Sequence, residues 1–323
     1  MDFEVYSKEE APVLAARLVT ETSLKEPLPL MDMRLGSTRG TNALLERKGT
    51  KSLMIVTKGF ADLPLIGTQQ RPHLFNINIK KSDLLFENAI EVKERIGTEG
   101  EILEPLSEHE INNVLRKVYR SDCQVIVIAL INSYRNPVHE KTLLRLLRTK
   151  GYKYVCASHE MGQVISFLPR LQTSLVNGYL MPVITDYLKN IRTKLSKHST
   201  LKIMTSSGGL IDSRLFQPKD SLFSGPAGGV IGAASFAESF GIKKILAFDM
   251  GGTSTDVSRY AGEYDYVFQT NVGEHAINSP ALYIESVAAG GGSVCNFDGF
   301  KFSVGPESAG ASPGPACYGA GGA

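Results

Sequence analysis

The chain has 323 residues, of which 42% are hydrophobic and 21% charged, with 31 glycines and no tryptophan. This composition excludes intrinsic disorder, collagen and coiled coil for the chain as a whole, and the length predicts two domains. The formal net charge of +2 lacks the basic surplus typical of proteins that bind nucleic acids or anionic membranes, so small molecules and other proteins are the expected partners.

The cysteines and histidines do not indicate a metal site. The four cysteines lie far apart, and none of the six histidines has the spacing of a ligand pair, so His159, His275 and Cys317 are expected to have ordinary roles. The longest apolar run, at 125–131, is much shorter than the roughly 20 residues of a membrane-spanning helix. With no recognisable signal peptide, the sequence predicts a cytoplasmic protein with reduced thiols.

Helices and strands alternate along the chain, which is typical of α/β proteins with mostly parallel sheets. The expected helices lie at 9–19, 41–48, 107–120, 137–150, 171–195 and 229–241. The expected strands lie at 52–57, 124–132, 153–158, 201–206 and 243–250, and an irregular stretch lies at 68–106. The strand at 124–132 is a nearly continuous apolar run, so it is expected to be buried on both faces.

Two helix starts carry recognisable capping residues. Ser107 and Glu110 have the spacing of a capping box, in which each side chain satisfies a backbone N–H at the start of a helix. Asn136 is the expected N-cap of the next helix, because Pro137 follows it at the first helical position.

The segment DMGGTSTD at 249–256 combines carboxylates, a glycine turn and several hydroxyl groups. Gly251 and Gly252 permit positive φ angles and leave backbone N–H groups free to converge on an anion. The hydroxyl donors beside them are Thr253, Ser254 and Thr255. Because a strand enters this turn and another leaves it, we expect a β-hairpin that grips phosphate groups. The alternative interpretation is a plain Gly-Gly hairpin turn.

The two aspartates of this segment are candidate catalytic residues. Asp249 ends a strand that we expect to be buried, which is where open α/β sheets bind ligands. With Asp256 it supplies the one or two carboxylates that hydrated Mg²⁺ prefers beside phosphate oxygens, so Asp249 is the predicted metal ligand. The sequence contains no GxxxxGK[ST] motif and no well-placed GxGxxG motif, which argues against P-loop and dinucleotide-binding folds.

The segment DMGGTSTDVS at 249–258 resembles the second phosphate loop of the actin-like ATPase superfamily, in the form found in the hydantoinase/oxoprolinase family. Further stretches resemble the same family in the same order, at 36–49, 57–63, 206–210, 224–234 and 287–319. The resemblance implies an α/β fold of the actin-like ATPase (ribonuclease H-like) type. It assigns residues 1–165 to the family's N-terminal region and 166–323 to its hydantoinase A domain.

Family members also open with an Asp-x-Gly-Gly-Thr hairpin, and no such motif precedes Asp249. The resemblance therefore implies an incomplete fold and part of a longer A-type polypeptide.

Two other glycine-rich segments are candidates for the site. Gly228 and Gly229, in SGPAGGV, precede a predicted helix, so they either bind an anion at its positive end or only allow close helix packing. The resemblance places the segment 287–319 near the family's active site, with a purely structural loop as the alternative. The substrate-contacting candidates there are Gly291, Gly292, Ser293 and Glu307.

Arg39 lies in STRGTN at 37–42, just before a predicted helix. Its planar guanidinium group suits bidentate pairing with a substrate carboxylate. The alternative is that this segment only caps the helix through Thr41 or Asn42.

The resemblance implies ATP-dependent hydrolysis of a cyclic amide, with 5-oxoproline opened to glutamate as the expected reaction and a hydantoin ring as the other substrate. Moving a phosphoryl group from ATP to the amide oxygen makes the ring carbon electrophilic to water. ATP and Mg²⁺ are the expected cofactors, and a B-type hydantoinase subunit or domain and further copies of the chain are the expected protein partners. A small-molecule kinase of the same fold and a non-catalytic piece or subunit are the alternatives.

Overall fold

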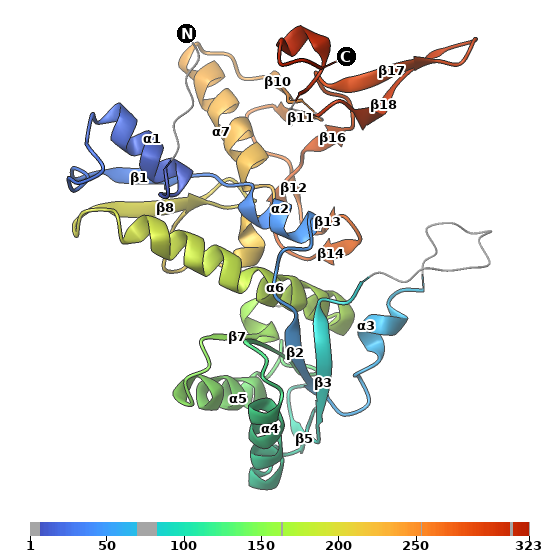
Figure 1. The fold of residues 1–323 in the computed structure, drawn as a ribbon. Coiled ribbons are helices and arrows are strands. Elements are labelled where there is room, and N and C mark those ends of the chain that lie inside the picture. The colour runs from blue at the N-terminus through green and yellow to red at the C-terminus, as the bar shows by residue number, and fades with distance from the viewer. Residues whose placement is uncertain (1–6, 70–82, 163, 253, 311–312, 323) are drawn as a thin grey trace.

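The computed structural model describes residues 7–69, 83–162, 164–252, 254–310 and 313–322, and its strands gather in three regions (Figure 1). The lowest region in Figure 1 is a four-stranded parallel sheet with the order β3-β2-β6-β7. Its strands are β2 (Ser52–Thr57), β3 (Phe86–Val92), β6 (Val125–Ala129) and β7 (Tyr154–Ala157). The antiparallel pair β4 (Arg95–Ile96) and β5 (Ile102–Glu104) lies beside it.

Helices cover both faces of the parallel sheet. They are α4 (Glu108–Arg120) and α5 (Val138–Thr149) on one face and the long α6 (Phe167–Arg192) on the other, and the short α3 (Leu63–Ile66) contacts α6. In β6, Ile126 packs in a core with α4 and α5, whereas its neighbour Val127 packs in another core with α6. This burial on both faces confirms the prediction for the strand. None of the described helices combines the length and apolarity of a membrane span.

Helix α6 also supports a second sheet, in the middle of Figure 1. Strand β1 (Asp32–Leu35) runs parallel to β8 (Thr200–Met204), and β9 (Leu210–Asp212) runs antiparallel to β8. Ile191 of α6 and Ile203 of β8 belong to the same core as Val127. One core therefore extends from the parallel sheet through α6 to β8. The helices α1 (Ala11–Val19) and α2 (Arg39–Leu45) and the short helix η2 (Pro218–Ser221) surround this region.

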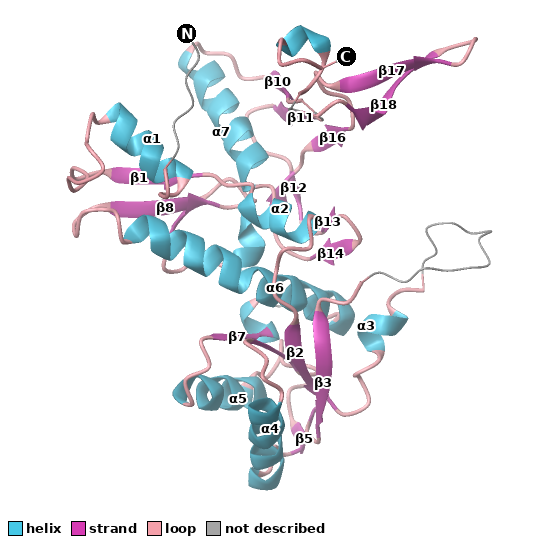
Figure 2. Ribbon diagram, viewed as in Figure 1, coloured by secondary structure: helices cyan, strands magenta, loops and turns pink. Residues whose placement is uncertain are grey.

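The third region consists of antiparallel strands beside helix α7 (Ser224–Ser239), as Figure 2 shows. Its main sheet has the order β10-β11-β16. These strands are β10 (Ile245–Met250), β11 (Thr255–Tyr260) and β16 (Glu285–Val287). Three smaller pairs accompany it: β12 (Tyr266–Val267) with β15 (Ala281–Leu282), β13 (Thr270–Val272) with β14 (His275–Ile277), and β17 (Ser293–Phe297) with β18 (Phe302–Ser308).

Most predicted helices and strands are confirmed to within a few residues, but the predictions for the stretch 68–106 and for the start of α7 are wrong. The stretch expected to be irregular contains β3, whose sequence FENAIEV is half polar because it forms an edge of the sheet. Helix α7 begins at Ser224 rather than at 229. The SGPAGG segment resembles a loop, yet Pro226 is the third residue of the helix, where its missing N–H costs no hydrogen bond.

Strand β10 was expected to be buried, and this prediction is wrong. Its apolar side chains Leu246, Phe248 and Met250 are 75%, 68% and 56% exposed. The opposite face packs against α7, through contacts that include the hydrogen bond from Tyr260 to Glu238. An apolar run in a sequence does not show whether one or both faces of the strand are covered. In β10, the described residues cover one face.

Candidate phosphate-binding site

The predicted hairpin at 249–256 is present. Strands β10 and β11 pair antiparallel, with Met250 opposite Thr255 at the end of the ladder. The turn is closed by a hydrogen bond of 2.9 Å from the Gly251 N–H to the Ser254 carbonyl. Among the described residues, the N–H groups of Gly252 and Ser254 have no acceptor within the chain. These two groups are therefore available to an anion, while Thr253 lies outside the described residues.

Asp249 and Asp256 face each other across the two strands, so their side chains project from the same face of the sheet. That face is the one beside α7, because a Cβ atom placed on Gly229 would lie 3.9 Å from Asp249 Oδ2. Asp256 is fixed by a hydrogen bond of 2.5 Å from the Ser286 hydroxyl. Within the part of the chain that the structure describes, Asp249 accepts no hydrogen bond and is the carboxylate free to bind a cation or water.

A second glycine-rich loop braces the hairpin turn. The N–H of Gly291 donates to the Gly251 carbonyl at 2.9 Å, and that of Gly292 donates to the Gly252 carbonyl at 2.7 Å. The Thr255 hydroxyl donates to the Ala289 carbonyl at 2.5 Å. These bonds occupy the N–H groups of both glycines and the Thr255 hydroxyl proton, so the three residues hold the turn in place instead of presenting those donors to a ligand.

Close backbone packing explains why glycine stands in this loop. A Cβ atom on Gly292 would lie 3.0 Å from the carbonyl oxygens of both Gly252 and Gly310. A Cβ atom on Gly291 would lie 2.8 Å from the Tyr318 hydroxyl oxygen. Three parts of the chain therefore meet here: the hairpin turn, the loop before β17 and the segment that follows β18.

The other two candidates from the 287–319 segment lie at the edge of this junction. The Ser293 hydroxyl accepts a hydrogen bond of 2.8 Å from the Gly290 N–H, which shapes its own loop and leaves its proton free to be donated. Ser293 pairs with Ser308 across β17 and β18. Glu307 precedes Ser308 on β18 and is exposed to solvent.

Gly228 and Gly229 do not lie at a helix end. They are the fifth and sixth residues of α7, beyond the first four residues whose N–H groups lack partners within a helix. The argument for anion binding at a positive helix end therefore does not apply to them. Gly229 instead lies opposite Asp249, where a Cβ atom would make an ordinary van der Waals contact with its carboxylate.

Arg39 lies apart from the hairpin, on α2. Its guanidinium group pairs with Glu10 at 2.7 Å and stacks over the Tyr187 ring at 4.7 Å. The prediction that Thr41 or Asn42 caps the helix is wrong, because α2 already begins at Arg39.

The segment before α2 contacts the start of α7. The Ser224 hydroxyl donates to the Ser37 carbonyl at 2.9 Å, and the Thr41 hydroxyl accepts from the Phe223 N–H at 3.4 Å. Helix α7 thus connects α2 to the strand that carries Asp249.

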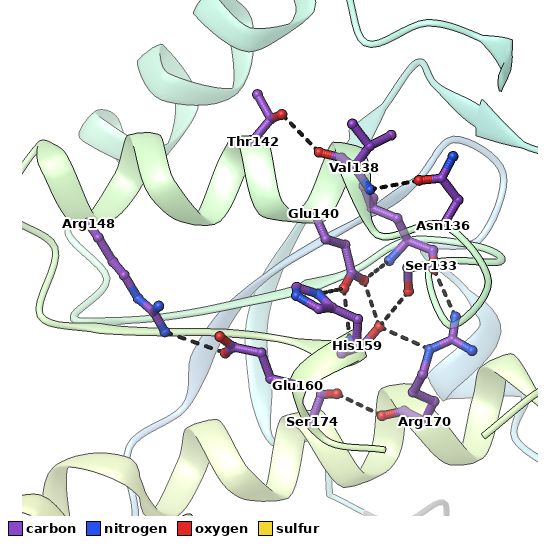
Figure 3. Close-up of polar contacts among 12 residues, drawn as sticks. Ser133, Asn136, Val138, Glu140, Thr142, Arg148, His159, Glu160, Arg170 and Ser174 are labelled. Atoms are coloured by element: carbon purple, nitrogen blue, oxygen red, sulfur yellow. Dashed lines mark hydrogen bonds and ion pairs between the residues drawn. The ribbon is translucent and has the colours of Figure 1, made fainter. Parts of the chain in front are cut away.

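The structure also shows a buried polar cluster that the sequence did not reveal, at the carboxyl ends of β6 and β7 (Figure 3). The Glu140 carboxylate accepts hydrogen bonds from the Leu130 N–H at 2.7 Å, the Ser158 hydroxyl at 2.6 Å and His159 Nδ1 at 2.6 Å. Arg170 donates to Ser158 at 3.0 Å and to the Leu130 carbonyl at 2.8 Å.

Glu140 comes from α5 and Arg170 from α6, so the cluster joins the helices on the two faces of the sheet. Burial lowers the pKa of Arg170, and the nearby Glu140 opposes that effect. Because its donors and acceptors pair with one another, the cluster fixes the loops after β6 and β7. His159 has a structural role, as expected. The signal in the sequence was the group of polar residues directly after two buried strands.

A similar buried pair lies beyond β2 and β3. Glu94 contacts His139 Nδ1 at 2.7 Å and accepts a hydrogen bond from the Thr57 hydroxyl. The other ring nitrogen of His139 accepts from the Leu106 N–H, which places the ring proton on Nδ1. The polar groups of Glu94 and His139 thus also have hydrogen-bond partners within the chain.

The hairpin fits a phosphate-bound cation better than a site made of protein ligands alone. The described residues contain no group of three or more His, Cys, Asp or Glu side chains that could hold a metal ion. Mg²⁺ usually takes one or two carboxylates and completes its shell with phosphate oxygens and water. Asp249, with Asp256 beside it, offers that donor set next to two free N–H groups.

Comparison with known proteins agrees with this geometry. The family described as hydantoinase/oxoprolinase N-terminal region matches residues 2–151, and the family described as hydantoinase/oxoprolinase matches 170–323. The chain is 38% identical to the 5-oxoprolinase of Saccharomyces cerevisiae, over 97% of this chain and 27% of that protein. It thus spans about a quarter of the length of that curated relative.

Two solved structures have the same fold. An ATP-dependent caprolactamase from Pseudomonas jessenii superposes with a TM-score of 0.76 and 29% identity, over 89% of this chain and 43% of that one. A nucleotide-free acetone carboxylase, from a study of ATP-dependent acetone carboxylation, gives a TM-score of 0.70 and 26% identity, over 95% and 46%. The predicted actin-like α/β fold is confirmed, and the chain belongs to the hydantoinase/oxoprolinase family.

Proposed function

We propose that this chain forms the phosphate-gripping part of an ATP-dependent enzyme that hydrolyses a cyclic amide, with 5-oxoproline opened to glutamate as the reaction. The observation that carries the proposal is the braced hairpin turn, where the N–H groups of Gly252 and Ser254 and the carboxylate of Asp249 have no partner among the described residues. The names of two similar proteins support the substrate class, because 5-oxoproline and caprolactam are both cyclic amides.

The chemistry explains why such an enzyme would use ATP. A cyclic amide is stabilised by resonance, and ATP supplies the phosphoryl group that makes its carbonyl carbon electrophilic to water. The chain's own residues have positioning roles. Gly252 and Ser254 donate to phosphate oxygens, Asp249 holds the Mg²⁺ ion or the attacking water, and Gly291 and Gly292 keep the turn rigid.

The remaining candidates have roles at the rim of this site in our proposal. Ser293 and Glu307 face the substrate side of the junction, and Thr253 adds a hydroxyl donor at the turn. Arg39, already paired with Glu10, reaches a substrate carboxylate only if that ion pair opens.

We also propose that residues 1–165 and 166–323 form the two family regions, which α6 joins. A B-type hydantoinase subunit or domain completes the enzyme in this proposal. Copurification of the chain with a candidate B-type polypeptide, followed by size-exclusion chromatography, tests this partner. A self-associated chain without a B-type partner would contradict it.

The proposed function is tested in two steps. Isothermal titration calorimetry of this chain with Mg·ATP is expected to show saturable binding, and an absence of binding by the folded chain would overturn the phosphate grip. In the complete polypeptide, glutamate and inorganic phosphate are expected to appear together when 5-oxoproline and ATP are supplied. A stable phosphorylated product without ring opening would instead indicate a small-molecule kinase.

A further inference from the structure

Tyr318 lies directly over the junction of the hairpin turn and the glycine loop. It ends the short helix η3 (Ala316–Tyr318). Cβ atoms placed on Gly291 and Gly252 would lie 2.8 Å and 3.8 Å from its hydroxyl oxygen, so this oxygen lies beside both glycines. The residue is 47% exposed, so part of this side chain at the junction is open to solvent.

The backbone around Tyr318 fixes the position of its ring. The Tyr318 N–H donates to the Pro315 carbonyl at 2.9 Å, and the Gly319 N–H donates to the Ala316 carbonyl at 3.1 Å. Gly319 has a φ of 69°, a conformation that favours glycine and ends the short helix. The ring is thus held by a turn whose shape is set by proline and glycine.

The Tyr318 hydroxyl differs from two other tyrosines of the same region. Tyr260 donates to Glu238 and Tyr283 donates to Glu285, so both have acceptors inside the chain. Tyr318 makes no side-chain hydrogen bond within the described ranges. A donor that lies beside the phosphate turn and has no acceptor among the described residues has the properties of a ligand-binding group.

We infer that the Tyr318 hydroxyl donates a hydrogen bond to an anionic oxygen of the polyphosphate ligand held by the N–H groups of Gly252 and Ser254. This inference rests on the proposed function, because it requires a phosphate-bearing ligand at that turn. Hydrogen bonds from neutral donors to phosphate oxygens are charge-assisted and stronger than those between neutral groups. The close approach at Gly291 then serves ligand binding, since any side chain there would displace the hydroxyl.

The test compares Mg·ATP binding by three forms of this chain in isothermal titration calorimetry. Tyr318→Phe removes the hydroxyl and keeps the ring, so its packing over the glycines is retained. Tyr266→Phe is the matched control, because Tyr266 is 48% exposed on β12 and lies outside the junction. We expect Tyr318→Phe to weaken binding about tenfold or more, and the control to bind as the unchanged chain does. Circular dichroism checks that all three are folded.

A second measurement reports on the hydroxyl itself. In the chain labelled with ¹³C at tyrosine Cζ, Mg·ATP is expected to shift one resonance, and that resonance should be missing from the Tyr318→Phe spectrum. Equal affinities for the unchanged chain and Tyr318→Phe, or an unshifted Tyr318 resonance, would overturn the inference and leave the proposed function standing. An unchanged chain that is folded but binds no Mg·ATP would overturn both.

Discussion

Asp249 and Asp256 lie directly opposite each other in the hairpin, yet only Asp256 has a hydrogen-bond partner within the described chain, the hydroxyl of Ser286. Two carboxylates in directly opposed positions repel each other, which costs stability unless a cation or a proton lies between them. The pair therefore contains one anchored carboxylate and one that remains free for a cation.

This difference predicts opposite effects of two similar substitutions. Asp249→Asn removes the repulsion, so the free energy of unfolding should rise by roughly 0.2 to 1 kcal/mol. The same change should weaken Mg·ATP binding about tenfold or more, because the free carboxylate is lost. Urea denaturation and calorimetry measure the two effects. If Asp249→Asn left Mg·ATP binding unchanged, Asp249 would not be part of the binding site.

Asp256→Asn should act mainly on stability. It removes the same repulsion but also replaces the charge-assisted bond from Ser286 with a weaker neutral one, and we expect a net loss of less than about 1 kcal/mol in free energy of unfolding. Ser286→Ala, which removes the same bond from the other side, is its matched comparison. If Ser286→Ala had no effect on stability, the Ser286 bond would not be what anchors this carboxylate.

The hairpin could be predicted from sequence because its determinants are local. The apolar strand, the two glycines and the returning strand lie within residues 243–260, and the antiparallel pairing follows from so short a connection. The brace from Gly291 and Gly292 joins segments about 40 residues apart, and no periodicity in the sequence indicates which two glycine loops will meet. The position of Tyr318 depends on the same long-range contact.

Local signals misled where tertiary packing decides the outcome. Pro226 and the glycines beside it suggested a loop, but packing against β10 and β11 makes them the first turns of α7. In β3, Glu87 and Asn88 obscured the apolar pattern, because one side of this edge strand faces solvent. The chemistry of Arg39 suits a substrate carboxylate, but its partner Glu10 lies 29 residues away in the chain, and no local pattern indicates that pairing.

The buried polar cluster makes a prediction about stability. Glu140 is fully buried and accepts hydrogen bonds on both oxygens, so the Glu140→Gln amide would turn an N–H₂ group toward donors. We expect a loss of about 3 kcal/mol in the free energy of unfolding. Glu160→Gln is the control, because Glu160 pairs with Arg148 at 3.4 Å near the surface, where ion pairs contribute little. Similar losses in both variants would contradict the importance of the cluster.

The lowered pKa of His275 predicts that the free energy of unfolding decreases in acid. Burial lowers the pKa of His275, with the nearby Arg47 acting in the same direction and Glu274 opposing it. The unfolded chain therefore binds this proton more readily than the folded chain, so stability decreases as the pH falls below the ordinary histidine pKa of about 6.5. In His275→Gln, the difference in unfolding free energy between pH 7 and pH 5 should be smaller. If the unfolding free energy changed equally between pH 7 and pH 5 in both proteins, His275 would not be the source of the acid sensitivity.

The cysteines should differ in reactivity. Burial raises the pKa of the Cys156 thiol to about 12, so it remains protonated and shielded in the folded chain. Cys295 and Cys317 are exposed. Brief treatment with iodoacetamide at pH 8, followed by mass spectrometry, should modify these two and spare Cys156, which should react only after urea is added. Modification of Cys156 in the folded chain would show that its strand opens readily.

The contact between Gly291 and Tyr318 can be measured by a double-mutant cycle that needs no ligand. Gly291→Ala places a methyl group 2.8 Å from the Tyr318 hydroxyl oxygen, and such overpacking typically costs about 1 to 3 kcal/mol. Tyr318→Phe removes that oxygen, and the next ring atom, Cζ, would lie 3.9 Å from the methyl group, an ordinary contact. The double variant should therefore be more stable than Gly291→Ala alone, with a coupling free energy of at least about 0.5 kcal/mol. Additive effects in urea denaturation would mean that the two residues do not touch in solution, and the proposed place of the hydroxyl beside the phosphate turn would then be lost as well.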